Sequence, residues 1–240
     1  MQKLQKIVQT IGISRRNSAD KIKNGEVKVN GKVIDEPWAE ISENSEIEVK
    51  DYKKFIYRED SIKYKYYLYN KPEDVLCSLK DQYGRKTISD VISEKNLENN
   101  LTYAGRLDYK TSGLIILTND GEYINKLTHP SFVIDKTYQA VLKKPVTKDD
   151  VARLENGVVI EGKKTAKAKV KIIANTYQRI VLNITIHEGM KRQVRLMVRE
   201  IGNHVISLKR IKFWKYTIDM VPKSGDIKDI TDIVEGGEKI

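Results

Sequence analysis

Residues 103–121 read YAGRLDYKTSGLIILTNDG and carry the most ordered pattern in the chain. The apolar run at 114–117 predicts a buried strand, and turn-forming segments flank it on both sides. Asp108 lies in the turn before this strand, where a carboxylate is held rigidly and stays accessible to a substrate. Taken alone, the pattern leaves Asp108 open as nucleophile, general base or turn-capping residue, and capping is the commonest of these roles. Asp120, in the turn after the strand, is interpreted as structural.

Outward from this stretch, several strand patterns follow one another without an intervening helix. This order favours an antiparallel or mixed sheet over a doubly wound parallel one. Strands are expected at 66–69, 114–118, 137–142, 166–173, 179–186 and 204–211. Helices are expected at 87–92, 122–128, 148–156 and 190–201. The sequence therefore predicts an α+β domain over 59–240, built on a mixed, mainly antiparallel sheet with flanking helices.

Residues 1–58 are expected to form a separate small αβ domain with its linker. A first helix is followed by Ser14, which is a suitable N-cap for a second helix at 15–24. The Asn-Gly pair at 30–31 lies between two alternating segments and predicts a β-hairpin. Residues 51–62 are polar and of mixed charge, which is typical of a linker.

The formal net charge is +11, from 44 Lys and Arg against 33 Asp and Glu. The excess lies in two blocks that are far apart in the sequence. Residues 1–34 contain eight basic and two acidic side chains, and residues 190–215 contain eight basic and one acidic side chain. Two such blocks suit a polyanionic partner, although a lysine-rich composition alone gives a similar count.

Composition also excludes several classes of protein. Cys77 is the only cysteine, so neither an internal disulfide nor a Cys-based zinc cluster is possible. The three histidines are too scattered to indicate a metal site, and no nucleotide-binding glycine motif is present. No apolar run approaches the roughly 20 residues of a membrane-spanning helix, and the N-terminus lacks a signal-peptide core. We therefore expect a cytoplasmic protein that uses no metal and no organic cofactor.

The stretch at 103–121 resembles the signature of the RsuA/RluA group of pseudouridine synthases, in which Gly-Arg-Leu-Asp-x-x-Thr-Ser-Gly-Leu leads into an apolar strand and Thr-Asn-Asp-Gly. Further segments of the large domain are similar to motifs of the same group: Tyr69-Asn70-Lys71-Pro72, Asp81-x-x-Gly84-Arg85-x-Thr87, Lys136-Thr137-Tyr138 and Lys191-Arg192-Gln193-Val194-Arg195. The front of the chain resembles an S4 RNA-binding domain in Ser14-Arg15-Arg16 and Val27-Lys28-Val29-Asn30-Gly31. This layout matches the RsuA/RluB/RluE/RluF branch. It implies an enzyme that converts a uridine of ribosomal RNA to pseudouridine.

The resemblance also implies roles for individual residues. Asp108 corresponds to the required carboxylate, and both covalent attack and removal of the C2′ proton stay open for it. Tyr138 corresponds to the tyrosine that accepts the C5 proton and could stack on the uracil ring. Arg195 corresponds to the arginine that pairs with the catalytic aspartate. Arg106 corresponds to the arginine that fills the space left by an extruded base.

Other basic residues are expected to contact RNA. On the helix at 190–201, Arg192 is expected to face phosphates, whereas Arg199 is interpreted as solvated. Lys71 is interpreted as either structural or phosphate-contacting, and His187 and His204 as structural. In the small domain the expected contacts are Arg15, Arg16, Lys21 and Lys32.

The resemblance has limits. Residues 212–218 depart from the family pattern, which leaves the geometry of the last strand open.

The expected partner is ribosomal RNA, free or in an assembling subunit, bound by a monomer. An alternative is a ribosome-assembly factor that binds RNA on the same fold with little or no catalysis. Intact Asp108, Tyr138 and Arg195 argue against that alternative.

Overall fold

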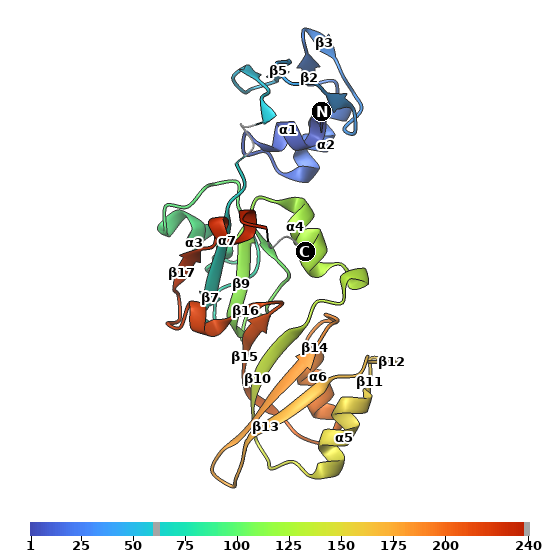
Figure 1. The fold of residues 1–240 in the computed structure, drawn as a ribbon, viewed down its shortest axis with the longest axis vertical. Helices are drawn as coiled ribbons and strands as arrows, with labels where there is room; N and C mark the ends of the chain where they lie inside the picture. The colour runs from blue at the N-terminus through green and yellow to red at the C-terminus, as the bar shows by residue number, and fades with distance from the viewer. Residues whose placement is uncertain (60–62, 238–240) are drawn as a thin grey trace. The chain divides into compact units, whose positions relative to one another are not determined.

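The computed structural model describes residues 1–59 and 63–237 and divides the chain into two compact units. The first unit comprises Met1–Tyr64 together with Asn96–Leu101. The second comprises Lys65–Lys95 and Thr102–Ile240. Figure 1 shows the chain coloured from blue at the N-terminus to red at the C-terminus.

The first unit consists of two short helices and two small sheets. Its elements are β1 (Gln2–Lys3), α1 (Leu4–Gln9), α2 (Arg15–Lys23), β2 (Val27–Val29), β3 (Lys32–Val33), β4 (Glu40–Ile41), β5 (Glu46–Val49) and β6 (Phe55–Ile56). Ser14 is the N-cap of α2, as predicted, and its hydroxyl accepts a hydrogen bond from the Asn17 N–H. Asn30 and Gly31 both have positive φ, 49° and 79°, which is the backbone of the predicted tight hairpin turn between β2 and β3.

The segment expected to be a linker is partly structured. Strand β6 pairs antiparallel with β5 and extends the sheet to the order β3-β2-β5-β6. Phe55 packs against the apolar core of this unit, which a purely polar linker would not do. The linker expectation is therefore wrong for these residues, and its part at 60–62 lies outside the described residues.

The second unit is built on one large sheet with helices beside it. Its strands are β7 (Tyr66–Lys71), β8 (Thr102–Ala104), β9 (Ser112–Thr118), β10 (Lys136–Leu142), β11 (Val159–Ile160), β12 (Lys163–Lys164), β13 (Lys169–Asn175), β14 (Ile180–Ile186), β15 (Val205–Phe213), β16 (Tyr216–Thr217) and β17 (Ile227–Asp229). Its helices are α3 (Ile88–Glu94), α4 (Gly121–Thr128), α5 (Lys148–Asn156), α6 (Gln193–Glu200) and α7 (Thr231–Glu235).

The large sheet is mixed and mainly antiparallel, so the predicted fold class is confirmed. Its order is β13-β14-β10-β15-β9-β7-β17, with β16 added beside β15 and β8 beside β9. Among the pairings of the described strands, the β9–β15 pairing is parallel and the other pairings of this sheet are antiparallel. The strands β10, β13, β14 and β15 carry α5 and α6 beside them (Figure 1). A core cluster joins these helices to the sheet through Leu154, Met197 and Leu182, all without exposed surface.

Helix α6 begins at Gln193, three residues later than expected. Arg192, its N-cap, adopts the left-handed conformation with φ 54°, which a continuing helix does not allow. The Gln193 side chain accepts a hydrogen bond from the Met190 N–H at 3.0 Å and donates to the Glu188 carboxylate. The inward residues Val194 and Met197 are those that the helical spacing predicts.

The unusual segment at 212–218 forms a hairpin. Strand β15 runs to Phe213, Trp214 turns with φ 55°, and Tyr216 pairs back onto Phe213. The rings of Trp214 and Tyr216 pack in a T-shaped arrangement, with 5.7 Å between their centroids. Strand β17 and helix α7, which follow, were not predicted from the sequence.

Gly113 is required where β9 meets β15. It pairs in register with Arg210, and a Cβ atom at Gly113 would lie 2.3 Å from the Arg210 carbonyl oxygen. Its φ of 109° is also unfavourable for any residue with a side chain. We expect Gly113→Ala to lower the free energy of unfolding by about 3 kcal/mol or more, measured by urea denaturation.

The matched control is Gly121→Ala at the start of α4. A Cβ there meets nothing within 4 Å, so this substitution should be neutral or stabilising by up to about 1 kcal/mol. Equal stability of the two variants would contradict the close approach of β9 and β15.

Candidate active site

Asp108 lies on the loop between β8 and β9, and backbone contacts hold this loop on both sides. The Leu107 N–H donates to Cys77 Sγ at 3.4 Å, and the Leu107 side chain is buried in the core. The Thr111 N–H donates to the Asp108 carbonyl at 2.9 Å and closes the turn. The Tyr109 carbonyl accepts from the Asp74 N–H at 2.9 Å. The Asp108 side chain, half-buried, is therefore carried by a backbone with little freedom.

The Asp108 loop borders a cavity of about 590 Å³. Four arginines line it: Arg85 from the loop before α3, and Arg192, Arg195 and Arg199 from the start and body of α6. The remaining lining residues are Tyr109, Lys110, Leu196, His204 and Val205. A carboxylate among several guanidinium groups can act on a ligand whose own negative charge the arginines bind.

Arg195 is bonded to the loop backbone instead of to the aspartate. Its guanidinium donates to the Lys110 carbonyl at 2.6 Å and to the Val205 carbonyl at 3.2 Å. Among the ion pairs of residues 1–59 and 63–237, none joins Arg195 to Asp108. Arg195 thus connects α6 and β15 to the loop two residues after Asp108. A direct pairing with the carboxylate stays a prediction.

Lys71 lies inside the protein. It has no exposed surface, and its ammonium donates to the Pro72 and Val75 carbonyls, both at 2.8 Å. Burial lowers its pKa below the ordinary value for lysine. Of the two roles considered for Lys71, the position favours the structural one, because a buried ammonium with two carbonyl partners does not reach a phosphate.

The other expected site residues fall into two groups. Tyr138 is 9% exposed and packs in the core cluster with Leu107, outside the lining of the cavity. Arg106 is exposed on the loop just before Asp108 and is also outside that lining. Arg192 is exposed and lines the cavity, a position from which it can face phosphates.

Seven of the lining residues received no site role from the sequence, among them Arg85, Arg199 and His204. Arg199 was interpreted as solvated; it is exposed and also lines the cavity. His204 was interpreted as structural, yet it lines the same cavity. Arg85 belongs to the motif at 81–87, which was the one sequence signal that could have placed it here. Asp120, in contrast, is structural as predicted: its carboxylate caps α4 and accepts the Tyr66 hydroxyl at 2.7 Å.

Two further cations are buried on the core face of the sheet. Arg210, 1% exposed, lies opposite Tyr138 in register, and its Nε donates to the Leu114 carbonyl at 2.7 Å. Its guanidinium lies over the Phe213 ring at 4.5 Å. Lys136 donates to the Ile134 and His187 carbonyls at 3.1 and 3.4 Å. Burial, together with the charge of Arg210, lowers the pKa of Lys136 to about 8.

In the first unit, the expected RNA-binding residues are mostly free. Arg15, Arg16 and Lys32 are exposed, and none of them forms an ion pair within the described residues. Lys21 pairs with Glu26 at 2.7 Å and lies over the Tyr52 ring at 5.8 Å. The charge of Lys21 is thus partly matched within the protein.

Metal-binding clusters and membrane-spanning helices are both absent from the described residues. Within 1–59 and 63–237, no three His, Cys, Asp or Glu side chains gather where they could share a metal ion. No helix in the same part of the chain has the length and apolar character needed to cross a membrane.

A carboxylate loop beside an arginine-lined cavity, on a mixed sheet, suits an enzyme that acts on a polyanion. Residues 65–200 match the family model of RNA pseudouridylate synthase, which is more than half of the chain. The chain therefore belongs to the RNA pseudouridylate synthase family, in its RsuA/RluB-type branch.

Relatives agree with this assignment along nearly the whole chain. The chain is 41% identical to the ribosomal large subunit pseudouridine synthase B of Bacillus subtilis (strain 168), over 96% of this chain and 93% of that protein. It is 31% identical to the ribosomal small subunit pseudouridine synthase A of Haemophilus influenzae, over 94% of each. A crystal structure of a pseudouridylate synthase is similar with a TM-score of 0.63 and 30% identity, covering 95% of this chain and 96% of that one.

The depressed pKa of Lys136 makes stability depend on pH. The folded protein releases the Lys136 proton near pH 8, whereas the unfolded chain holds it to about 10.5. Between these values the unfolded state binds more protons, so the Lys136 contribution to stability rises with pH. We expect the free energy of unfolding, relative to a Lys136→Met variant, to increase by roughly 3 kcal/mol from pH 7 to pH 10.5.

Urea denaturation of both proteins at a series of pH values measures this difference. Because Lys136→Met retains the other titrating groups, their contributions cancel in the comparison. A difference that stays flat, or that falls with pH, would contradict a buried and destabilised ammonium at this position.

Proposed function

We propose that the chain isomerises a specific uridine of ribosomal RNA to pseudouridine, with Asp108 as its catalytic carboxylate. The position of Asp108 on a fixed loop, at the edge of a cavity that four arginines line, carries this proposal. Family membership supports the reaction, and relatives named for large- and small-subunit ribosomal RNA support the substrate class. These relatives are named for different ribosomal subunits, the large one and the small one.

The reaction breaks the C1′–N1 bond, rotates the base and joins C1′ to C5, after which C5 loses its proton. Asp108 acts in the first stage, either by covalent attack or by removing the C2′ proton. Neither C1′ nor C5 is accessible in a stacked uridine, so the nucleotide must leave the stack. Arg106, exposed two residues before Asp108, is proposed to occupy the space that the base vacates.

Tyr138 is proposed to accept the C5 proton. It lies on β10 between Ile184 and Arg210, and it belongs to the same core cluster as Leu107, the neighbour of Asp108. Membership of the cluster that anchors the Asp108 loop through Leu107 supports the role, and the proton transfer is proposed to be direct or through a water molecule. Arg195 is proposed to position Asp108, since its guanidinium holds the Lys110 carbonyl of the same loop.

The first unit is proposed to contain an S4-like RNA-binding domain at residues 1–58. Its order of two helices and a small sheet supports this, as do the exposed Arg15, Arg16 and Lys32. The remainder, 59–240, is proposed as the catalytic domain. We further propose that the protein acts as a monomer in the cytoplasm, where ribosomal RNA is available free or in an assembling subunit.

Replacement of Asp108 tests the catalytic proposal. Asp108→Asn retains the shape of the side chain but removes its charge and basicity, so isomerisation should fall by a factor of about 10⁴ or more. Affinity for ribosomal RNA should change by less than about threefold, because the arginines are retained. Tritium release from ribosomal RNA labelled at uridine C5 measures the reaction.

The control is Asp149→Asn on α5, an exposed aspartate outside the cavity that makes the same change of charge. It should react like the wild type. Wild-type protein that binds ribosomal RNA without releasing tritium would exclude the enzyme. Normal tritium release by Asp108→Asn would exclude Asp108 as the catalytic carboxylate.

The proposed RNA contacts of the first unit are tested by salt dependence. Arg15→Gln and Arg16→Gln, made singly, should each reduce the slope of log K against log salt by about 0.7 to 0.9 for every phosphate that the arginine neutralises. Lys54→Gln serves as the control, since that ammonium pairs with Glu46 and Glu48 at 3.4 and 3.1 Å. Identical slopes for all three variants would argue against RNA binding by α2.

A further inference from the structure

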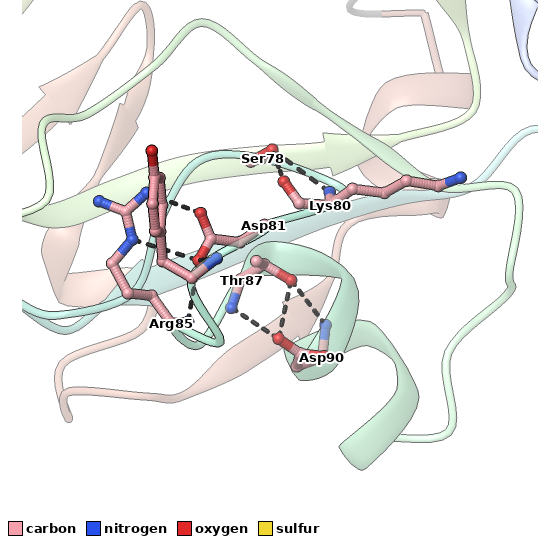
Figure 2. Close-up of polar contacts among 7 residues, drawn as sticks. Ser78, Lys80, Asp81, Arg85, Thr87 and Asp90 are labelled. Atoms are coloured by element: carbon pink, nitrogen blue, oxygen red, sulfur yellow. Dashed lines mark hydrogen bonds and ion pairs between the residues drawn. The ribbon is translucent and has the colours of Figure 1, made fainter.

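Arg85 is held in place by Asp81, four residues earlier in the loop before α3. Its Nη2 donates to Asp81 Oδ1 at 2.6 Å and its Nε to Asp81 Oδ2 at 3.2 Å, a two-pronged ion pair (Figure 2). The same carboxylate accepts the backbone N–H groups of Tyr83 and Arg85 at 3.1 and 2.9 Å. The Asp81 side chain is 6% exposed, whereas that of Arg85 is 42% exposed. The carboxylate is therefore the fixed partner, and the guanidinium faces outward.

Two tyrosine rings further restrict the guanidinium. Its central carbon lies 5.1 Å from the centroid of Tyr83 and 6.0 Å from that of Tyr109. Tyr109 follows Asp108 directly, so the contact with the Tyr109 ring links Arg85 to the loop that carries Asp108. Cations over aromatic faces lose rotational freedom and keep their hydrogen-bonding edges available.

Arg85 contributes to the same cavity as Asp108, from a segment about 100 residues away from the arginines of α6. A guanidinium has five N–H donors, and Asp81 occupies two of them. Within the described residues, the remaining donors of Arg85 have no hydrogen-bond partner. They are available to an anionic group that enters the cavity.

Neighbouring cations on this loop do not share this arrangement. The Lys80 side chain extends away from Arg85 (Figure 2). Lys86 pairs with Glu94 at 2.6 Å and is outside the lining of the cavity. The orientation toward the cavity is thus a property of Arg85, which Asp81 holds. Lys80 and Lys86 on the same loop do not share it.

We propose that Arg85 binds a phosphodiester group of the RNA strand beside the target uridine, and that Asp81 is the positioning residue that orients it. The inference rests on the proposed function and deepens it, since it assigns a substrate contact on the wall of the cavity formed by the loop before α3. Arg192 and Arg199 of α6 provide cations on another part of the lining. The strand would then be held by residues from both segments while Asp108 acts between them.

The low pKa of Asp81 is consistent with this arrangement. The Arg85 guanidinium, followed by the backbone N–H groups, lowers the pKa of Asp81 to about 2. The pair therefore stays ionised throughout the pH range in which RNA is bound.

Binding of a fluorescein-labelled oligouridylate of about 12 nucleotides, followed by anisotropy from roughly 50 to 300 mM KCl, tests the contact. Arg85→Gln should raise the Kd about tenfold at low salt and reduce the salt slope by about 0.7. Lys86→Gln, the control with the same change of charge at the adjacent residue, should leave the slope unchanged. Arg85→Lys should give an intermediate Kd, because it keeps the charge and removes the two-pronged geometry.

Asp81→Asn separates positioning from simple electrostatics by the sign of its effect. Removal of a negative charge beside an RNA-binding cavity should by itself tighten binding. If Asp81 orients Arg85, the variant should instead weaken oligouridylate binding severalfold, and raise KM for ribosomal RNA with kcat within about twofold of wild type. Tighter binding by Asp81→Asn, or an unchanged salt slope in Arg85→Gln, overturns the proposal.

The outcomes distinguish this inference from the proposed function. If wild-type protein releases no tritium from ribosomal RNA while Arg85→Gln still has a smaller salt slope on the oligouridylate, the proposed catalysis fails and the phosphate contact stands. If tritium is released and the slope of Arg85→Gln equals that of wild type, the proposed contact alone fails. If a thermal melt shows that Asp81→Asn does not fold, the salt slope of oligouridylate binding by Arg85→Gln, a change at an exposed residue, decides whether the proposed phosphate contact exists.

Discussion

The site depends on one backbone contact, the parallel pairing of β9 with β15. This pairing joins β13, β14, β10 and β15 on one side to β9, β7 and β17 on the other. The two strands approach so closely at Gly113 and Arg210 that no Cβ fits between them. Asp108 precedes β9, whereas α6 leads into β15. The contact thus fixes the carboxylate relative to the arginines, which come from parts of the chain about 90 residues apart.

Arginine and lysine serve two different purposes around this junction. Lys71, Lys136 and Arg210 are buried, and they interact with backbone carbonyls or with the Phe213 ring, not with carboxylates. Carbonyl partners accept hydrogen bonds from a cation without cancelling its charge, so each of these groups, when protonated, adds to the positive potential of the unit. The cavity arginines are the exposed counterpart, and they retain donors that a ligand can use. The buried cations and the cavity arginines both attract a polyanion, and the cavity arginines bind it.

Local signals in the sequence were sufficient for most elements but not for the site. The cap at Ser14, the turn at residues 30–31 and the helix at 148–156 were predicted because each depends on neighbouring residues. Strand β17 was missed because its short segment gains a partner in β7, about 160 residues earlier. For the same reason the burial of Lys71 was not predicted: its motif could be recognised, but its burial depends on how the sheet packs.

The cavity shows more directly that contacts between distant parts of the chain could not be predicted from local sequence. Resemblance suggested Asp108 and Arg195 as a pair, yet the partners of Arg195 are two carbonyls that only the tertiary structure brings together. This difference bears on chemistry. An arginine that held the carboxylate itself would compete with the substrate for its oxygens, whereas one bonded to the Lys110 carbonyl fixes the loop and leaves both oxygens available. Asp108 is thus oriented by its backbone. Among the ion pairs of the described residues, none involves Asp108, which suits the attack or deprotonation proposed for it.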